Sequence, residues 1–305
     1  MTTSLTGIGE AARRGGELRA GGTDLMSRPA AGPHIDLRGR PELSGVVWRE
    51  DGTVRVGALT TIADLAADPR LASAHPCLAR TAAAVATPEI RAVATLGGNL
   101  LQRNRCPYFR SPAFSCFQDG GHDCPAQDGL TLRAAVVRTG PCLAPHPSSL
   151  AVALLACEAS VEVHGEAPFP VGELYGDGAD PTRDHLLPPG AILAAVVLPP
   201  PRAGERAAYH RATARAYAEW PLAEAAARLV VDDGRVRFAR VAVGGVARVP
   251  LRLTEVEQAL LAGEPLEQAA ARAAARCTPT IQNAYKIALL TGTILQALEQ
   301  AATPR

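Results

Sequence analysis

The sequence predicts a mixed fold in which strands and helices alternate through two domains. The chain has 305 residues, of which 47% are hydrophobic and 20% charged, so it can bury a core large enough for two domains or one large one. Segments with strand periodicity and segments with helix periodicity follow one another along the chain. The proline-rich run from Pro199 to Gly204 has the composition of a linker. It predicts domains at 1–204 and 205–305.

Each element has its own signal. Alternation of apolar and polar residues predicts strands at 17–20, 34–37, 53–58, 160–164, 191–198 and 236–243. Apolar residues three or four positions apart predict helices at 61–67, 76–86, 149–159, 216–231, 255–262 and 285–301. The second of these helices should stop near Thr87 and Pro88, because the residue before a proline avoids helical backbone.

Charge and hydropathy exclude two kinds of partner. The chain has 31 basic and 30 acidic residues, a formal net charge of +1, and no stretch where basic and aromatic residues interleave, so nucleic acid is not an expected partner. No apolar run approaches the roughly 20 residues that a membrane-spanning helix needs. Residues 1–16 also lack the apolar core of a signal peptide. We therefore expect no membrane span and a cytoplasmic location, with export only as a passenger on a partner's signal.

Two glycine pairs carry the first chemical signal. Gly21 and Gly22 follow a predicted strand, and Gly97 and Gly98 follow a predicted helix. Binding a diphosphate without a metal requires backbone N–H groups that converge from turns without bulky side chains, and glycine permits such turns. Each pair alone is more often a structural turn than a binding site. Neither has the GxGxxG spacing of a Rossmann loop, so a nicotinamide site gains little support.

The distribution of the seven cysteines carries the second signal. Cys77, Cys157 and Cys277 lie in alanine-rich, helix-like contexts and are predicted to be small buried residues. The other four lie in the segment 102–145, which is rich in proline and glycine: Cys106, Cys116, Cys124 and Cys142. Four thiolates suit zinc or an iron–sulfur cluster, and the absence of a close CxxC pair favours the cluster. The residues alone leave a cluster, zinc and unligated cysteines open. His122 and His146 could substitute for a cysteine ligand, but each is expected first as a hydrogen-bonding residue of the loop.

Taken in order, these motifs resemble the FAD-binding medium subunits of the molybdenum hydroxylases, the xanthine dehydrogenase and carbon monoxide dehydrogenase family. The resemblance runs from Leu18 to Ala301 and includes the segments 241–250 and 283–286. It implies an α+β fold of the vanillyl-alcohol-oxidase (PCMH-like) type, with two subdomains clasping FAD. A C-terminal domain like that of the CO dehydrogenase flavoprotein, a three-stranded antiparallel sheet with helices, would follow.

The resemblance also implies binding residues for FAD. In the first loop these are Ala20, Gly21, Gly22, Thr23, Asp24 and Leu25, and in the second Thr95, Gly97, Gly98 and Asn99. Ser149 stands where the family commonly has an aspartate near the flavin. Loss of that carboxylate would remove a negative charge and raise the flavin potential.

Residues around the cysteines are similar to a subgroup with an inserted [4Fe-4S] loop, which includes the flavin subunits of periplasmic aldehyde oxidoreductase and 4-hydroxybenzoyl-CoA reductase. The similarity lies in 102–103, 106–110 and 146–148. It implies that Cys106, Cys116, Cys124 and Cys142 hold one [4Fe-4S] cluster, within a metal-binding loop at 102–145.

In such complexes a large molybdopterin subunit acts on the organic substrate, a small subunit carries [2Fe-2S] centres, and the flavin subunit exchanges electrons with an external acceptor or donor. The resemblance therefore implies an electron-transfer flavoprotein, an oxidoreductase component whose own catalytic residues stay unknown. One alternative is a stand-alone FAD and [4Fe-4S] oxidoreductase that acts directly on a small molecule, and another is a module that holds FAD inertly.

Overall fold

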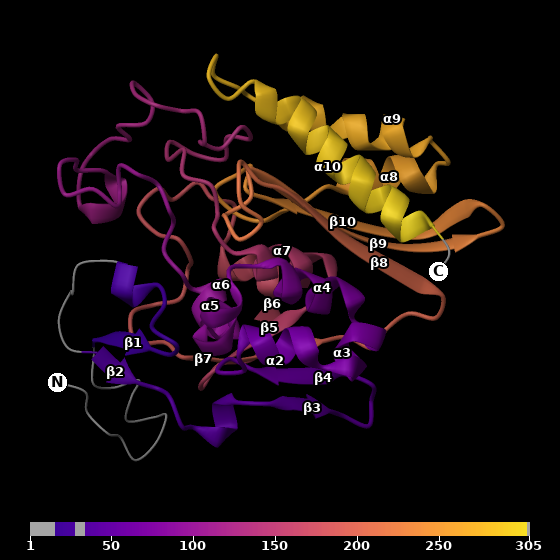
Figure 1. Ribbon diagram of the computed structural model, residues 1–305, viewed down its shortest axis with the longest axis horizontal. Helices are drawn as coiled ribbons and strands as arrows, with labels where there is room; N and C mark the ends of the chain where they lie inside the picture. Colours follow the sequence, from indigo (N-terminus) through magenta and orange to yellow (C-terminus); the bar gives the residue numbers. More distant parts are fainter. Residues whose placement is uncertain (1–15, 28–33, 304–305) are drawn as a thin grey trace.

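The structure is a computed structural model that describes residues 16–27 and 34–303. Residues 1–15 lie outside the described residues, so most of the N-terminal segment that was searched for a signal peptide is not described. Two layers of strands and helices stack on one another (Figure 1). Within the described residues no helix is both long and apolar enough to cross a membrane.

The first layer contains a small and a larger sheet. The strands β1 (Glu17–Arg19) and β2 (His34–Asp36) pair in parallel. The larger sheet has five antiparallel strands in the order β3 (Val46–Trp48), β4 (Val54–Gly57), β7 (Leu193–Leu198), β5 (Ser160–Val163) and β6 (Phe169–Pro170). Its helices are α2 (Ile62–Ala67), α3 (Pro69–Ala74), α4 (Pro76–Ala84), α5 (Pro88–Val93), α6 (Leu96–Leu100) and α7 (Ser149–Ala156).

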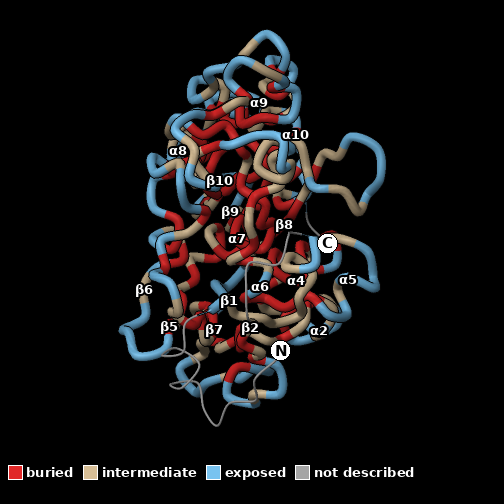
Figure 2. The backbone as a smooth tube through the Cα atoms, turned by 90° about the vertical axis from the view of Figure 1, so that its left-hand side faces the viewer, coloured by how far each residue is buried: buried red, intermediate tan, exposed pale blue. Residues whose placement is uncertain are grey.

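The second layer is a four-stranded antiparallel sheet in the order β11 (Leu251–Arg252), β10 (Arg235–Gly244), β9 (Ala223–Asp232) and β8 (Glu205–Ala212). Three strands are long and β11 has only two residues. The helices α8 (Thr254–Leu261), α9 (Leu266–Ala271) and α10 (Tyr285–Ala302) cover one face. The helices α4 and α7 of the first layer pack against the other face. Figure 2 shows buried backbone concentrated where α7 meets this sheet.

Short 3-10 helices complete the structure at Leu25–Ser27, Pro41–Leu43, Phe117–Asp119, Val171–Leu174 and Arg272–Arg276.

Most predicted elements are confirmed, but the helix predicted at 216–231 is wrong. Residues 223–232 form β9, whose first seven residues are all buried. Because this strand is covered on both faces, it lacks the apolar–polar alternation that marks a half-exposed strand. Its alanines gave a helical signal, since alanine has the highest helix propensity, and tertiary packing overrides that preference. Pro88 also begins a helix of its own, α5, with Thr87 as its N-cap.

The segment 102–145 has no strand and a single turn of 3-10 helix, but its second half is firmly anchored. Val136 and Val137 pack into the core of the second layer. The buried ammonium of Lys286 donates to the carbonyl of Ala134 at 3.1 Å and to that of Gly245 at 2.7 Å. The second half of the predicted metal-binding loop is therefore held by contacts that do not involve its cysteines.

Candidate functional site

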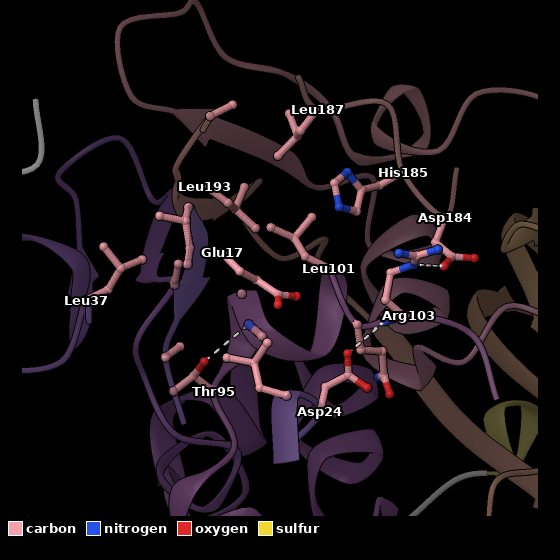
Figure 3. Close-up of a pocket in the computed structure, with 18 of the residues that line it drawn as sticks. Glu17, Asp24, Leu37, Thr95, Leu101, Arg103, Asp184, His185, Leu187 and Leu193 are labelled. Atoms are coloured by element: carbon pink, nitrogen blue, oxygen red, sulfur yellow. Dashed lines mark hydrogen bonds and ion pairs between the residues drawn. The ribbon is translucent and has the colours of Figure 1, made fainter. Parts of the chain in front are cut away.

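A cavity of about 500 Å³ opens between the two glycine loops and the segment that leads into β7 (Figure 3). Its volume lies in the range of small-molecule sites. Nine of the predicted FAD residues line it: Ala20, Gly21, Gly22, Thr23, Asp24, Leu25, Thr95, Gly97 and Gly98. The structure thus brings the two motifs, more than seventy residues apart in sequence, to one cavity.

The first glycine loop presents backbone donors to this cavity. Among the described residues, the N–H groups of Gly21, Gly22 and Thr23 have no hydrogen-bond partner. A Cβ on Gly21 would lie 1.9 Å from the carbonyl oxygen of Val93, so only glycine allows the loop to rest on the end of α5. Gly22 has φ +79°, which favours glycine. Consecutive free N–H groups in such a turn form a concave site for an anion.

The second glycine loop differs, because its N–H groups are already used within the protein. Gly97 donates to the carbonyl of Ala58 at 2.8 Å, and Gly98 donates to Oγ1 of its N-cap residue Thr95 at 3.2 Å. The predicted second nest of free N–H groups is therefore wrong. At Gly98 a Cβ would lie 3.0 Å from Oγ1 of Thr95 and 4.0 Å from Cβ of Ala20 in the first loop, so the two loops lie close together.

The Asp24 carboxylate contacts residues of the cysteine segment. Arg110 contacts Oδ1 at 2.9 Å and Arg105 contacts the same oxygen at 3.0 Å. The backbone N–H of Arg103 donates to Oδ2 at 3.1 Å (Figure 3). Asp24 therefore joins the first glycine loop to the start of the cysteine segment.

Two predicted FAD residues are absent from the cavity wall. Asn99 accepts a hydrogen bond from Ser148 at 2.7 Å. Ser149 is buried in the first turn of α7 and hydrogen bonds to Glu224, which also accepts from the Tyr209 hydroxyl at 2.5 Å. Burial raises the pKa of Glu224. The structure thus gives no support to direct contact of Asn99 or Ser149 with FAD, or to a flavin potential raised by Ser149.

Sequence reasoning missed the third wall of the cavity, which comes from residues 182–193. It includes Asp184, His185 and Leu187, which Figure 3 shows facing the cavity. Burial would raise the pKa of Asp184, but Arg248 and Arg103 lower it to about 2. The turn Pro188-Pro189-Gly190 before a predicted strand was the available signal, since such turns often build binding loops.

The four clustered cysteines line one small cavity of about 10 Å³. Burial raises the pKa of Cys106 and Cys116, and the Cys142 thiol donates to Cys124, which lowers the pKa of Cys124 to about 6 and raises that of Cys142. Each sulfur also receives the backbone N–H of the residue two positions later, namely Tyr108, Gln118, Ala126 and Ala144. Hydrogen bonds to sulfur of this kind accompany metal-bound thiolates.

The four thiols are gathered without the geometry of a metal site. In the part of the chain that is described, no three His, Cys, Asp or Glu side chains form a group that could hold a metal ion. Neither histidine named as a substitute ligand lines the cysteine cavity. His122 is exposed, and the buried ring of His146 packs edge-on against Tyr175 at 4.5 Å. The cluster therefore stays a prediction.

Comparison with known families covers both halves of the chain. Residues 11–201 match the family described as the FAD binding domain in molybdopterin dehydrogenase. Residues 207–301 match the CO dehydrogenase flavoprotein C-terminal domain.

Two characterised relatives resemble nearly the whole chain. The aldehyde oxidoreductase FAD-binding subunit PaoB of Escherichia coli is 34% identical over 299 residues, 94% of this chain and 92% of the relative. The carbon monoxide dehydrogenase medium chain of Afipia carboxidovorans is 30% identical over 263 residues, 84% of this chain and 74% of the relative.

Solved structures share the fold. A chain of carbon monoxide dehydrogenase from Hydrogenophaga pseudoflava superposes with a TM-score of 0.76 at 24% identity, covering 98% of this chain and 96% of that one. A chain of quinoline 2-oxidoreductase from Pseudomonas putida 86 gives 0.71 at 20% identity, covering 97% and 92%. The predicted fold class, an α+β FAD-binding domain followed by the C-terminal domain, is confirmed. The chain belongs to the FAD-binding medium subunits of the molybdenum hydroxylase family, and it is an FAD-dependent oxidoreductase of that family.

Proposed function

We propose that this chain is the electron-transfer subunit of a molybdenum hydroxylase complex, and that it passes electrons between its partners and an external acceptor or donor. The observation that carries the proposal is the anion site of Gly21, Gly22 and Thr23 at the edge of the 500 Å³ cavity. FAD supplies a flavin that takes up and releases electrons. The protein contributes position and electrostatics, and no acid–base group of this chain needs to act on an organic substrate.

The residues of the cavity fit FAD in distinct ways. The free N–H groups of the first loop suit the diphosphate, which needs donors and little steric bulk. Thr95 and Gly98 of the second loop line the same cavity. Apolar side chains at Leu37, Leu43 and Leu59 line another part of the cavity and suit an aromatic ring system. We infer noncovalent attachment, because neither glycine loop contains a cysteine or a histidine.

We further propose that Cys106, Cys116, Cys124 and Cys142 hold a [4Fe-4S] cluster. Support comes from the convergence of four thiols on one cavity and from the backbone N–H directed at each sulfur. A cluster supplies a one-electron carrier. Because its ligands are thiolates, binding would release the protons of the cysteine thiols, and the loop would have to open around the added atoms.

The partners proposed are a large molybdopterin subunit and a small [2Fe-2S] subunit, without nucleic acid. Support comes from the names of the relatives, which are an FAD-binding subunit and a medium chain. We also propose that the boundary between the two domains lies at 204/205, because one family match ends before this position and the other begins after it. A cytoplasmic location remains an expectation from the sequence.

The experiment has two parts. The chain is purified anaerobically with FAD, denatured, and the released flavin identified by mass; FAD is expected, and FMN or no flavin would contradict the proposal. A molybdopterin subunit and a [2Fe-2S] subunit are then sought among the neighbouring genes and co-expressed with the chain, and a stable heteromeric complex is expected. A monomer that turns over an organic substrate alone at enzymatic rates would instead establish the stand-alone oxidoreductase.

A further inference from the structure

A buried ion network lies between the flavin cavity and the cysteine cavity. Its centre is Asp184, whose side chain is 1% exposed. The carboxylate accepts from Nη1 of Arg248 at 2.6 Å and from Nε of Arg103 at 2.7 Å. It also accepts from Asn104, through the backbone N–H at 3.2 Å and the side-chain amide at 3.1 Å. Asp184 thus binds two guanidinium groups and an amide at once.

These partners belong to both cavities. Arg103 and Asp184 line the flavin cavity, where Figure 3 shows them in contact. Asn104 lines the cysteine cavity, and its Oδ1 accepts from the backbone N–H of Cys106 at 3.0 Å. The same carboxylate therefore touches a wall of each cavity.

The third partner comes from the C-terminal domain. Arg248 lies between β10 and β11, its side chain is 2% exposed, and its Nη2 donates to the carbonyl of Arg183 at 2.6 Å. Two guanidinium groups and one carboxylate give this network a net charge of +1, and its Arg248 and Asp184 side chains are almost completely shielded from water. Charges shielded from water act strongly on their surroundings.

We propose that Asp184 is a positioning residue that sets the electric field of the flavin cavity and holds the base of the cysteine segment against it. The inference rests on the proposed function, because it needs a flavin in the cavity. Asp184 offsets the charge of Arg103 at the cavity wall. It also holds Asn104 in place, and Asn104 accepts a hydrogen bond from the backbone N–H of Cys106, the first of the four cysteines. Charge near a bound flavin tunes its reduction potential, since positive charge favours the reduced, more anionic form.

The charge of the network predicts opposite shifts for two single variants. Asp184→Asn keeps the shape of the side chain and changes the net charge of the network from +1 to +2, so the flavin midpoint potential should move to a more positive value. Arg248→Met changes the net charge to 0, so the potential should move to a more negative value. The double variant restores +1 and should return the potential toward that of the wild type.

The test is a spectroelectrochemical titration of the FAD-loaded chain. The matched control is Asp177→Asn, because Asp177 is an exposed carboxylate in the same segment whose Oδ1 accepts from the N–H of Ala179, a bond that asparagine can also accept. Its potential should equal that of the wild type. Thermal unfolding of each variant is measured in parallel, since a purely structural Asp184 would lower the unfolding temperature and leave the potential unchanged.

The outcomes separate this inference from the proposed function. If the wild type binds no flavin, the proposed function fails. If it binds FAD, and Asp184→Asn has the wild-type potential or the double variant keeps the shift of the single one, the inference about Asp184 is wrong. Should Asp184→Asn fail to fold, the double variant decides, because its potential should lie above that of Arg248→Met and near that of the wild type.

Discussion

The flavin cavity and the cysteine cavity differ in how they are built. The flavin cavity is about 500 Å³ and is framed by β1, the start of α6 and the turn before β7, all parts of the hydrogen-bonded fold. The cysteine cavity is about 10 Å³ and is formed by loop residues of the segment 102–145. The first can exist before its ligand arrives, whereas in the second Cys142 donates to Cys124 in place of a metal. FAD should therefore bind to a finished site, and iron should change the loop that holds it.

The largest expected effect is loss of metal from the cysteine cavity. Replacing any one of Cys106, Cys116, Cys124 or Cys142 by serine should lower iron and acid-labile sulfide from about four of each per chain to a small fraction of that, because a cubane cluster needs all its ligands. Iron and sulfide assays on anaerobic protein measure this. Zinc in the wild type, or a full cluster in Cys142→Ser, would show that the ligand assignment is wrong.

The same variants should expose only part of the segment to proteases. Metal binding is coupled to folding, and residues 106–130 have only a few contacts outside the cysteine segment, such as Arg110 to Asp24 and Gln118 to the carbonyl of Pro181. The following stretch is held by Val136, Val137 and Lys286. Limited proteolysis read by mass spectrometry should therefore find new cuts before residue 131 and none between 131 and 137. Cuts spread evenly through 102–145 would contradict the anchoring.

Lys286 tests that anchoring through pH. Burial lowers its pKa from the ordinary 10.5 to about 8, so between these values the unfolded chain binds a proton that the folded chain does not. Stability then rises with pH across this window, and the penalty of the buried charge is fully present below about pH 8. We expect the free energy of unfolding of the wild type, relative to Lys286→Met, to rise by up to about 3 kcal/mol from pH 8 to 10.5. Denaturant titrations at several pH values measure this difference. A difference that stays constant with pH would show that burial does not lower the pKa of Lys286.

A matched glycine pair tests the flavin side. Gly22 and Gly39 have φ of +79° and +76°, so alanine should cost each about 1 kcal/mol of stability. Only Gly22 lines the cavity, and a methyl group there should disturb the N–H groups that face the diphosphate. FAD affinity should fall about tenfold in Gly22→Ala, equivalent to about 1.4 kcal/mol, and stay unchanged in Gly39→Ala. If a flavin titration gives Gly22→Ala and Gly39→Ala the same FAD affinity, the diphosphate does not bind at this loop.

Sequence reasoning was sound where a signal is local. The glycines of the first loop need a positive φ or a close approach to α5, and no other residue meets that need, so the motif is visible in the sequence. The long helices and strands follow from periodicity for the same reason. The strand β9 was missed because it is buried on both faces, and burial by α7 and α10 is a tertiary property.

Of the candidate FAD site, only the two glycine motifs could be predicted from the sequence. Nothing in the second motif indicated that Ala58 and Thr95 use its N–H groups, since Ala58 comes from a distant turn. Asp184 was missed for a similar reason: its partners Arg103 and Arg248 lie 81 and 64 residues away. Long-range pairing of buried charges leaves no periodic trace in a single sequence.

The smallest expected effect belongs to the cysteines outside both cavities. Cys77 and Cys157 are each 1% exposed and lie in the core of the first layer, where they act as small apolar residues. Serine at either position should lower the free energy of unfolding by about 1 to 2 kcal/mol, since a hydroxyl is harder to bury than a thiol. FAD content and iron content should both equal those of the wild type, because neither residue lines the flavin or the cysteine cavity. Loss of iron in Cys157→Ser would mean that the two groups of cysteines are not independent, and the division between a structural set and a ligand set would have to be redrawn.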